Sequence, residues 1–253
     1  MKPVRYLHLN PFHGLRASQA RGLFRLLLKF FPLHLLTQAR FEFSVLLNRL
    51  RHGRTRRRWQ NQRGLLVNLG CGNTGRAGWV NVDAFPAPGV NCVCDCRRGL
   101  PFDDASCAGI FTEHFLEHVD YTEEVPLLLD ECNRVLAPGG VIRIIVPDAG
   151  RYLRCYALPG WDELSLLRGL SSDHDDPYSN CRFRTKMEVV NEIFRQGTQH
   201  KYAYDEATLT QVLLDAGFTR IETKSFGVSA DTRLVLDQSG RAHESLYVEG
   251  IKV

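Results

Sequence analysis

Two glycines and one carboxylate lie close together in the segment VNLGCGNTGRAGWVNVD, which covers residues 67–83. Gly70 and Gly72 directly follow a short apolar run, and Asp83 ends the next such run eleven residues after Gly72. Glycine lets the backbone approach a ligand closely, and a carboxylate ending a neighbouring strand can accept hydrogen bonds from a ribose diol. The pattern indicates a nucleotide-type cofactor, although Gly75 and the early acid depart from the dinucleotide fingerprint.

Two histidines are candidates for proton-transfer chemistry. His114 directly follows the apolar run AGIFTE, beside Glu113, and His200 lies shortly before the segment DEATLTQVLLDAGF. An imidazole at either position could act as the general base for an acceptor that must lose a proton. Glu117 and His118 come a few residues after His114, and we expect this pair to hold the local turn.

The acidic side chains of Asp173, Asp175 and Asp176 offer hard oxygen ligands for a divalent cation. No supporting ligand spacing accompanies them, and acidic loops are common on protein surfaces. We therefore expect no metal site, and a solvated acidic loop is the preferred interpretation. These three carboxylates remain the candidate metal ligands.

The elements that must position these residues are visible in the hydrophobic pattern after residue 64. Five apolar runs are typical of strands, namely GLLVNLG, GWVNVD, VNCVCD, AGIFTE and GVIRIIVPD. TEEVPLLLDECNRVL predicts a helix before Pro-Gly-Gly, and DEATLTQVLLDAGF predicts another, capped by Asp205. RIETKSFGV and ESLYVEGIKV predict a closing strand pair. Together they predict an α/β fold with a doubly wound, mostly parallel, seven-stranded Rossmann-like sheet.

Charge divides the chain into two parts. Residues 1–63 carry fourteen Lys and Arg and a single acid, a net charge of +13, whereas the rest of the chain carries −9. We expect residues 1–63 to form a basic helical arm and residues 64–253 to form the cofactor-binding domain. Residues 151–200 fit this pattern poorly and are predicted to form an inserted lid over the acceptor region.

The basic arm has three interpretations. Arg21, Arg25 and Lys29 share one predicted helical face, and residues 56–58 are all arginine. The arm could pack on the body with a solvated basic edge, lie in a membrane surface through residues 15–58, or contact nucleic acid. Charged residues and Pro32 interrupt the apolar run well before it could span a bilayer.

Eight cysteines occur, and the N-terminal residues do not have the pattern of a secretory signal. We therefore expect reduced thiols in a cytoplasmic protein that can lie at the inner membrane surface. Cys92, Cys94 and Cys96 alternate, so they would share one face of a strand. Three thiols could ligate zinc, but the usual C-x-x-C spacing is missing, and small buried side chains are the preferred interpretation.

Four segments in order, VNLGCG, VNVD, CDCRRGLPFDDASCAGIFTEHFLEHV and ECNRVLAPGGVIRIIVPD, resemble the class I S-adenosylmethionine-dependent methyltransferases. The resemblance is greatest to the type 11 branch, in which the link between the first two strands is short. It covers residues 64–150 closely and residues 200–253 more loosely. It implies a methyltransferase that uses S-adenosylmethionine and releases S-adenosylhomocysteine.

The resemblance also implies the roles of individual residues. The glycine loop would face the amino-acid part of the cofactor, Asp83 the ribose, and Asp95 with Cys96 the adenine. The predicted cofactor-binding residues are Asn68, Gly70, Cys71, Gly72, Asp83, Asp95, Cys96 and Glu113. The predicted catalytic residues are His200, His114 and Glu113, at the methyl-transfer cleft.

Methyl transfer from a sulfonium mainly requires alignment, and an alcohol acceptor also requires a base or a metal ion. The branch is associated with saccharide and glycan modification, so we expect O-methylation of a saccharide hydroxyl or a similar small polar acceptor. One alternative is an RNA methyltransferase that uses the arm as a tether, although residues 112–114 lack the Asn-Pro-Pro-Tyr motif of base-amino methyltransferases. The other is a non-catalytic scaffold subunit that binds S-adenosylmethionine.

Overall fold

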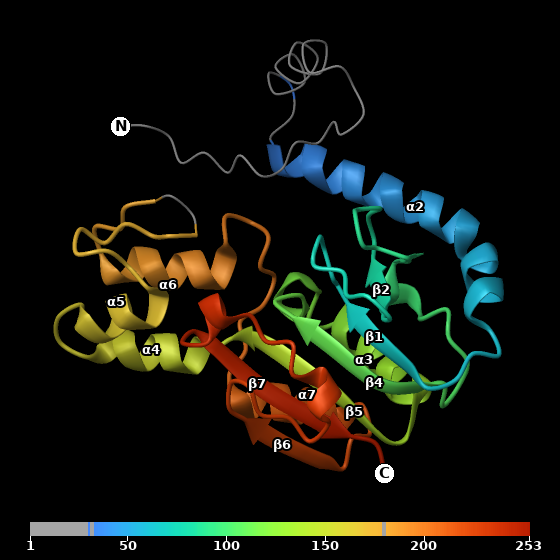
Figure 1. Ribbon diagram of the computed structural model, residues 1–253. Helices are drawn as coiled ribbons and strands as arrows, with labels where there is room; N and C mark the ends of the chain where they lie inside the picture. The colour runs from blue at the N-terminus through green and yellow to red at the C-terminus, as the bar shows by residue number, and fades with distance from the viewer. Residues whose placement is uncertain (1–29, 31–32, 179–180) are drawn as a thin grey trace.

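The computed structural model describes residue 30 and residues 33–178 and 181–253 (Figure 1). The predicted basic face of Arg21, Arg25 and Lys29 lies outside the described residues. The helices are α2 (Leu33–Trp59), α3 (Glu124–Val135), α4 (Ala149–Ala157), α5 (Asp162–Arg168), α6 (Lys186–Arg195) and α7 (Glu206–Asp215). The strands are β1 (Leu65–Leu69), β2 (Val80–Asp83), β3 (Cys92–Val93), β4 (Cys107–Glu113), β5 (Leu136–Pro147), β6 (Arg220–Lys224) and β7 (Ser245–Ile251). Short 3₁₀ turns are η1 (Cys96–Arg98), η2 (Leu116–His118), η3 (Thr232–Leu234) and η4 (Ser239–Arg241).

The seven strands form one sheet in the order β3-β2-β1-β4-β5-β7-β6. The strands β1 to β5 pair in parallel, and β7 runs antiparallel to both β5 and β6. The predicted mostly parallel, seven-stranded α/β sheet is therefore confirmed. Because parallel strands end at the same edge of a sheet, the loops after β1, β2, β3 and β4 meet there (Figure 1).

The two faces of the sheet are covered differently. The helices α3 and α7 cover one face, and the apolar positions of the predicted helices, such as Leu128, Leu129 and Leu213, are fully buried in the largest core cluster. The N-cap prediction for α7 holds, because the Asp205 carboxylate accepts the N–H of Thr208 at 2.9 Å. The other face packs against residues 225–241, from which Leu234 enters the core.

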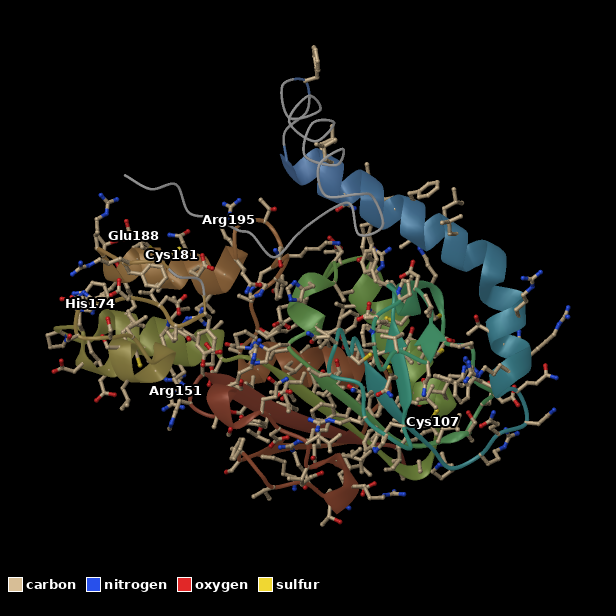
Figure 2. The ribbon with its side chains drawn as sticks, turned by 45° about the horizontal axis from the view of Figure 1, so that its top comes forward. Cys107, Arg151, His174, Cys181, Glu188 and Arg195 are labelled. Carbon is tan, nitrogen blue, oxygen red and sulfur yellow. The ribbon has the colours of Figure 1, made fainter. Side chains whose placement is uncertain are left out.

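Helices α4, α5 and α6 form a small unit with a core of its own, which contains Tyr152, Leu164 and Ile193 among others. Figure 2 shows His174, Cys181, Glu188 and Arg195 in this unit, whereas Cys107, at the start of β4, lies at the far end of the strands. The unit therefore stands at the carboxyl end of the sheet. It occupies the segment predicted as a lid.

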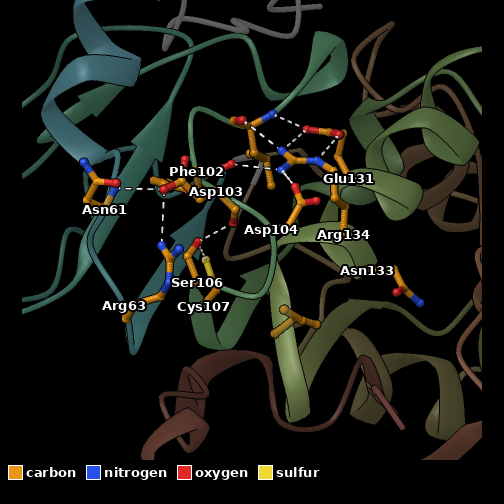
Figure 3. A network of polar contacts seen from close by, with 12 residues as sticks. Asn61, Arg63, Phe102, Asp103, Asp104, Ser106, Cys107, Glu131, Asn133 and Arg134 are labelled. Atoms are coloured by element: carbon orange, nitrogen blue, oxygen red, sulfur yellow. Dashed lines mark hydrogen bonds and ion pairs between the residues drawn. The ribbon is translucent and has the colours of Figure 1, made fainter.

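Helix α2 packs along the β2–β3 side of the sheet (Figure 1). Val45 and Trp59 are buried, and the Trp59 ring meets the Phe102 ring edge-on at 6.2 Å. After the helix, the backbone N–H of Asn61 and the Arg63 guanidinium both donate to Asp103 Oδ2, at 2.8 and 3.2 Å (Figure 3). These contacts anchor the end of the arm to the body.

All eight cysteines are free thiols, and seven are buried. Cys92, Cys94 and Cys96 all belong to the main core cluster. The prediction that they are small buried side chains is therefore confirmed. They do not share a strand face as predicted, because β3 contains only Cys92 and Val93 while Cys96 begins η1. In the described part of the chain, each helix is too short or too polar to cross a membrane.

Candidate active site

The loop after β1 needs glycine at two positions. Gly70 and Gly72 have φ angles of +68° and +53°, which a residue with a Cβ adopts at a cost. A Cβ on Gly70 would lie 2.2 Å from Cγ of Phe115, so this glycine also permits a close approach between two loops. The N–H groups of Gly70 and Cys71 donate to the carbonyl of Val82 at 2.9 and 3.1 Å, which ties the loop to β2.

Asp83 closes the glycine loop from the end of β2. Its Oδ2 accepts the N–H of Gly72 at 2.8 Å, and its Oδ1 accepts the N–H of Phe85 at 2.9 Å. A carboxylate has about four lone-pair sites, so this half-exposed side chain keeps acceptor capacity for a ligand hydroxyl. The structure thus brings together the glycines and the acid that the sequence singled out.

Two predicted members of the cofactor site have structural partners. Asn68 is buried on β1, and its Nδ2 donates to the carbonyl of Thr74 at 3.1 Å, bracing the glycine loop from below. The thiol of Cys71 is buried next to Asp83, and burial raises the pKa of Cys71 to about 12. Both side chains therefore shape the loop, and only its backbone and Asp83 are left to face a ligand.

Asp95 and Cys96 form the loop after β3. Both carboxylate oxygens of Asp95 accept from the Arg97 guanidinium, at 2.7 and 3.1 Å, and Arg97 in turn pairs with Glu124 at 2.6 Å. Cys96 is packed into the core. Asp95 is therefore engaged in a buried ion pair, and its role beside the adenine stays a prediction.

Glu113, the last residue of β4, and His114, which follows it, lie in different environments. Oε1 of Glu113 accepts the N–H of Gln238 at 2.9 Å, on the face covered by residues 225–241. His114 has a φ of +50°, a conformation that is uncommon for a residue with a Cβ and concentrates at functional sites. Its Nε2 lies 2.9 Å from Ser245 Oγ and its Nδ1 lies 3.3 Å from Glu117 Oε1.

Glu117, His118 and His200 converge next to His114. One ligand-type atom from each, a carboxylate oxygen and two ring nitrogens, lies within 4.8 Å of the others. The rings of His118 and His200 stand edge-to-face with centroids 4.8 Å apart. The predicted catalytic residues His114 and His200 are thus brought together across 86 positions of sequence, and Glu113 is not part of this cluster.

The backbone holds this cluster in position. The N–H of Lys201 donates to the carbonyl of Glu117 at 2.7 Å, which fixes the His200 loop against η2. Nδ1 of His200 lies 2.6 Å from the carbonyl of Ile193, and Nδ1 of His118 lies 3.2 Å from the carbonyl of Gln199. Only a protonated nitrogen can donate to a carbonyl, so Nδ1 carries a proton in both rings.

Burial and charge act against each other in this cluster. Burial acts to raise the pKa of Glu117, but His114 at 3.3 Å and the rings of His118 and His200 outweigh it and lower that pKa to about 2. Burial lowers the pKa of His200 below its ordinary value, against the opposing effect of Glu117. The histidines therefore favour the ionised form of the carboxylate, and burial favours the neutral form of His200.

A cavity of about 60 Å³ opens onto the cluster. His114, Glu117, His118 and His200 line it, together with polar side chains that include Arg168 and Glu244. This volume holds about two water-sized groups, since one water takes about 30 Å³ of liquid. A larger surface hollow of about 490 Å³ lies between α4 and α7. None of the predicted catalytic residues lines that hollow.

The predicted acidic metal ligands do not converge. Asp173 pairs with Arg182 at 3.2 Å on the surface, and the Asp175 carboxylate accepts from the Ser171 hydroxyl at 3.4 Å. Asp176 is buried and takes two hydrogen bonds from Arg168, at 3.1 and 3.0 Å. The loop is therefore only partly solvated, and Asp176 is a structural partner of Arg168.

Sequence reasoning assigned Glu117 and His118 to the local turn, and their contribution to this cluster was missed. The spacing His-x-x-Glu-His in residues 114–118 is the one signal that could have identified it, because a single turn presents all three side chains. The contribution of Arg168 and Glu244 to the cavity had no such local signal.

Phe115 links the cluster to the glycine loop. Its ring lies against Gly70, and Glu117 follows it by two residues in η2. The residues that would hold the cofactor and the cluster that could activate an acceptor are therefore neighbours at the carboxyl edge of the sheet. The open side of Gly72, where an added Cβ would meet nothing within 4 Å, and the remaining acceptor capacity of Asp83 fit an adenosyl group with a vicinal diol.

Residues 68–144 match the family model described as "Methyltransferase domain". No curated protein matches the chain in sequence. Among solved structures, a SAM-dependent methyltransferase from Methanosarcina mazei is similar at 15% identity and a TM-score of 0.43, over 78% of this chain and 96% of the other. A S-adenosylmethionine-dependent methyltransferase from Mesorhizobium loti is similar at 17% identity and a TM-score of 0.42, over 79% and 96%.

Phosphoethanolamine N-methyltransferase 2 of Haemonchus contortus, solved with phosphomonomethylethanolamine and S-adenosylhomocysteine, is similar at 14% identity and a TM-score of 0.40. The alignment covers 76% of this chain and 50% of the Haemonchus chain. This chain therefore spans about half the length of that enzyme.

Proposed function

We propose that this protein, a class I S-adenosylmethionine-dependent methyltransferase whose residues 68–144 form the family's methyltransferase domain, methylates a hydroxyl oxygen of a saccharide or a similar small polar acceptor. The observation that supports an oxygen acceptor is the cluster of His114, Glu117, His118 and His200 beside the glycine loop. A hydroxyl must lose its proton during transfer, and an amine or thiolate needs less help.

The cofactor supplies an activated methyl group when it is bound. On this proposal, the loop of Gly70, Cys71 and Gly72 holds its amino-acid part and Asp83 accepts from its ribose hydroxyls. Asp95, Cys96 and Asn68 complete the pocket through their backbone and shape. Glu113 holds the backbone of Gln238 and so positions the loop that follows β6.

The imidazoles supply the base. His200 presents a neutral Nε2 because its Nδ1–H is directed at the carbonyl of Ile193. His200 lines the cavity, and on this proposal its Nε2 takes the hydroxyl proton while His114 and Glu117 stabilise the charge that develops. Alignment of the acceptor oxygen with the methyl group then gives the larger part of the rate enhancement. It can lower the activation free energy by up to about 7–11 kcal/mol in favourable cases.

The cavity supports a polar acceptor. Charged and amide side chains dominate its lining, including Arg168, Glu192, Gln196 and Arg241. Its volume of about 60 Å³ admits a hydroxyl group and its carbon, while the rest of a sugar ring would remain outside, against the α4–α6 unit. A saccharide, with hydroxyls around its ring, matches both properties.

Methyl transfer from radiolabelled S-adenosylmethionine to saccharides, lipid-linked glycans and RNA tests the proposal. We expect label on a saccharide hydroxyl and, for His200→Ala, a turnover reduced at least about a hundredfold with unchanged cofactor affinity. His243→Ala, an exposed histidine outside the cluster, is the matched control. Label on RNA instead would favour the tethered RNA enzyme, and cofactor binding without any transfer would favour the scaffold.

We also propose that the arm contacts an anionic membrane surface. The inner face of α2 packs on the body, whereas Phe43 and Leu46 on its outer face are 62% and 51% exposed. Arg54 and Arg57 continue this outer face toward the end of the helix and are exposed. An apolar stripe followed by arginines suits the boundary between acyl chains and acidic head groups.

Sedimentation with vesicles tests the membrane contact. We expect co-sedimentation with vesicles that contain phosphatidylglycerol, little with pure phosphatidylcholine, and loss of binding in Phe43→Ser/Leu46→Ser. Arg220→Ser, at an exposed arginine on β6, is the control. Equal binding to both vesicle types would contradict the proposal, and salt-sensitive binding to RNA alone would assign the arm to nucleic acid.

A further inference from the structure

The cluster of Glu117, His118 and His200 has an electrostatic imbalance that the proposed base chemistry leaves unexplained. Glu117 is 1% exposed, and neither of its carboxylate oxygens has a hydrogen-bond partner. A buried ionised carboxylate is strongly unfavourable without a compensating charge and hydrogen bonds. The contact to His114 Nδ1, at 3.3 Å, reaches one oxygen only and lacks hydrogen-bond geometry.

The imidazoles do not fill this gap. The Nδ1–H groups of His118 and His200 are directed at the backbone carbonyls of Gln199 and Ile193. With Nδ1 committed in this way, Nε2 of each ring is the nitrogen left to bind an ion. One ligand-type atom from each of Glu117, His118 and His200 lies within 4.8 Å of the others.

Two basic side chains near the cluster, Arg168 and Lys201, pair with other carboxylates. Arg168 pairs with Asp176 at 3.0 Å and with Glu244 at 2.7 Å, and Lys201 pairs with Glu124 at 3.3 Å. Among the described residues, no lysine or arginine forms an ion pair with Glu117. A cation bound from outside the chain would supply the charge that Arg168 and Lys201 do not.

We propose that Glu117, His118 and His200 bind a divalent transition-metal ion of the Zn²⁺ type, with open coordination positions facing the cavity. Two neutral imidazoles and one carboxylate form a ligand set that catalytic zinc sites use. A metal-binding histidine characteristically donates its other N–H to a carbonyl, as both rings do here. Tetrahedral Zn–N and Zn–O bonds of about 2.0–2.2 Å place ligand atoms roughly 3.3–3.6 Å apart, so the three ligand atoms, which lie within 4.8 Å of one another, would have to draw together by as much as about 1–1.5 Å.

The ion would give the cluster its chemical role, and this part of the inference rests on the proposed function. An acceptor hydroxyl that occupies an open position has a lowered pKa and loses its proton to solvent water. The oxygen then forms the new C–O bond while the C–S bond of the sulfonium breaks and sulfur keeps the electron pair. His200 then acts as a ligand, so the ion replaces the imidazole as the activating group.

Metal binding can be measured without cofactor or acceptor. Chelator-treated full-length protein is titrated with Co²⁺, whose visible absorption reports nitrogen coordination, and then with Zn²⁺ as a competitor. We expect one Co²⁺ per chain, displaced by one Zn²⁺, with a raised melting temperature. Glu117→Gln, His118→Ala and His200→Ala should each weaken binding about a hundredfold or more, beyond what loss of an outer hydrogen bond causes. His243→Ala should bind as the unsubstituted protein does.

The stoichiometry of the unsubstituted protein decides the matter even if a variant fails to fold. Absence of a visible Co²⁺ spectrum, or binding that survives in all three folded variants, overturns the metal site. Methyl transfer that proceeds at full rate in metal-free protein would overturn its catalytic role while leaving the proposed methyltransferase function intact. Tight one-to-one binding without methyl transfer to any saccharide would instead support the site and reject the proposed acceptor.

Discussion

Two of the buried charged side chains in this protein, Arg143 and Glu117, have opposite surroundings. Arg143, on β5, is 0% exposed and pairs with Asp237 at 2.6 Å and with Glu249 at 2.8 Å. It also donates to the carbonyl of Val228 at 2.8 Å. Glu117, at 1% exposure, has no hydrogen-bond partner for either oxygen.

The difference separates a structural charge from a functional one. Arg143 is compensated by groups of the same chain, and its contacts hold residues 225–241 against the sheet. Glu117 has a contact with His114 at 3.3 Å but no hydrogen bond, and we infer that a ligand completes its surroundings. A buried charged side chain that is fully paired within its own chain therefore indicates a structural role. A buried charged side chain without such partners indicates a binding site.

The largest effect should follow from breaking the compensated site. Arg143→Met leaves the buried carboxylates of Asp237 and Glu249 without a counter-charge, so we expect the free energy of unfolding to fall by about 3–5 kcal/mol. Urea unfolding measures it. Arg184→Met, which removes a surface pair with Glu188, should cost at most about 1 kcal/mol. Equal effects of the two changes would show that burial of Arg143 does not matter.

An intermediate effect is expected at Asp83. Its carboxylate accepts hydrogen bonds from the N–H groups of Gly72 and Phe85 and keeps further acceptor capacity for a ligand. Asp83→Ala should weaken binding of S-adenosylmethionine about tenfold or more, since a hydrogen bond to a charged group contributes about 1.5–3 kcal/mol. Titration calorimetry measures the affinity. Asp231→Ala, which removes the partner of Arg233 in the segment 225–241, is the control. Unchanged affinity would exclude a ribose contact.

A small effect on stability should follow from Glu117→Gln in metal-free protein. The amide keeps the volume, removes the uncompensated charge and offers a donor to the imidazole lone pairs. We expect the free energy of unfolding to change by less than about 1 kcal/mol or to rise. A loss of about 3–5 kcal/mol would mean that protonated histidines compensate Glu117 internally, and the contrast with Arg143 would disappear.

The smallest effect is expected for the reactivity of the cysteines, whose buried thiols are uncharged. Burial raises the pKa of Cys94 to about 12 and that of Cys107 to about 11. At pH 8 both are therefore overwhelmingly thiols, and the thiolate is the form that reacts. Alkylation of native protein, followed by mass spectrometry, should modify the half-buried Cys181 first. Rapid modification of Cys94 would contradict this order.

Much of the fold could be predicted because it is encoded over short distances. Apolar runs of strand length gave β1, β2, β4, β5 and the pair β6–β7, and the 3.6-residue period gave α3 and α7. The glycine loop and Asp83 were also predictable, since only eleven residues separate Gly72 from the acid it contacts. The match of residues 68–144 covers this same segment.

The functional cluster could be predicted only in part. His114 and His200 were selected separately, but nothing in the local sequence relates Glu117 to a loop more than 80 residues away. The burial of Arg143 could not be predicted either. The run VIRIIVP predicts a strand but gives no sign that its arginine is buried. Periodicity reports which face of an element is apolar, and it carries no information about charges that meet from different elements.

The amino-acid sequence by itself determined the strands and helices, the glycine bend with its nearby acid, and the division between a basic arm and an acidic body. Each of these depends on neighbours within a turn, a strand or one short link. Only the tertiary structure decided which charges are compensated, because the Lys201–Glu117 backbone bond and the left-handed turn at His114 bring the distant groups together. Burial then removes water as a hydrogen-bond partner. Whether a charged side chain is compensated therefore depends on tertiary contacts, which form only when the chain folds.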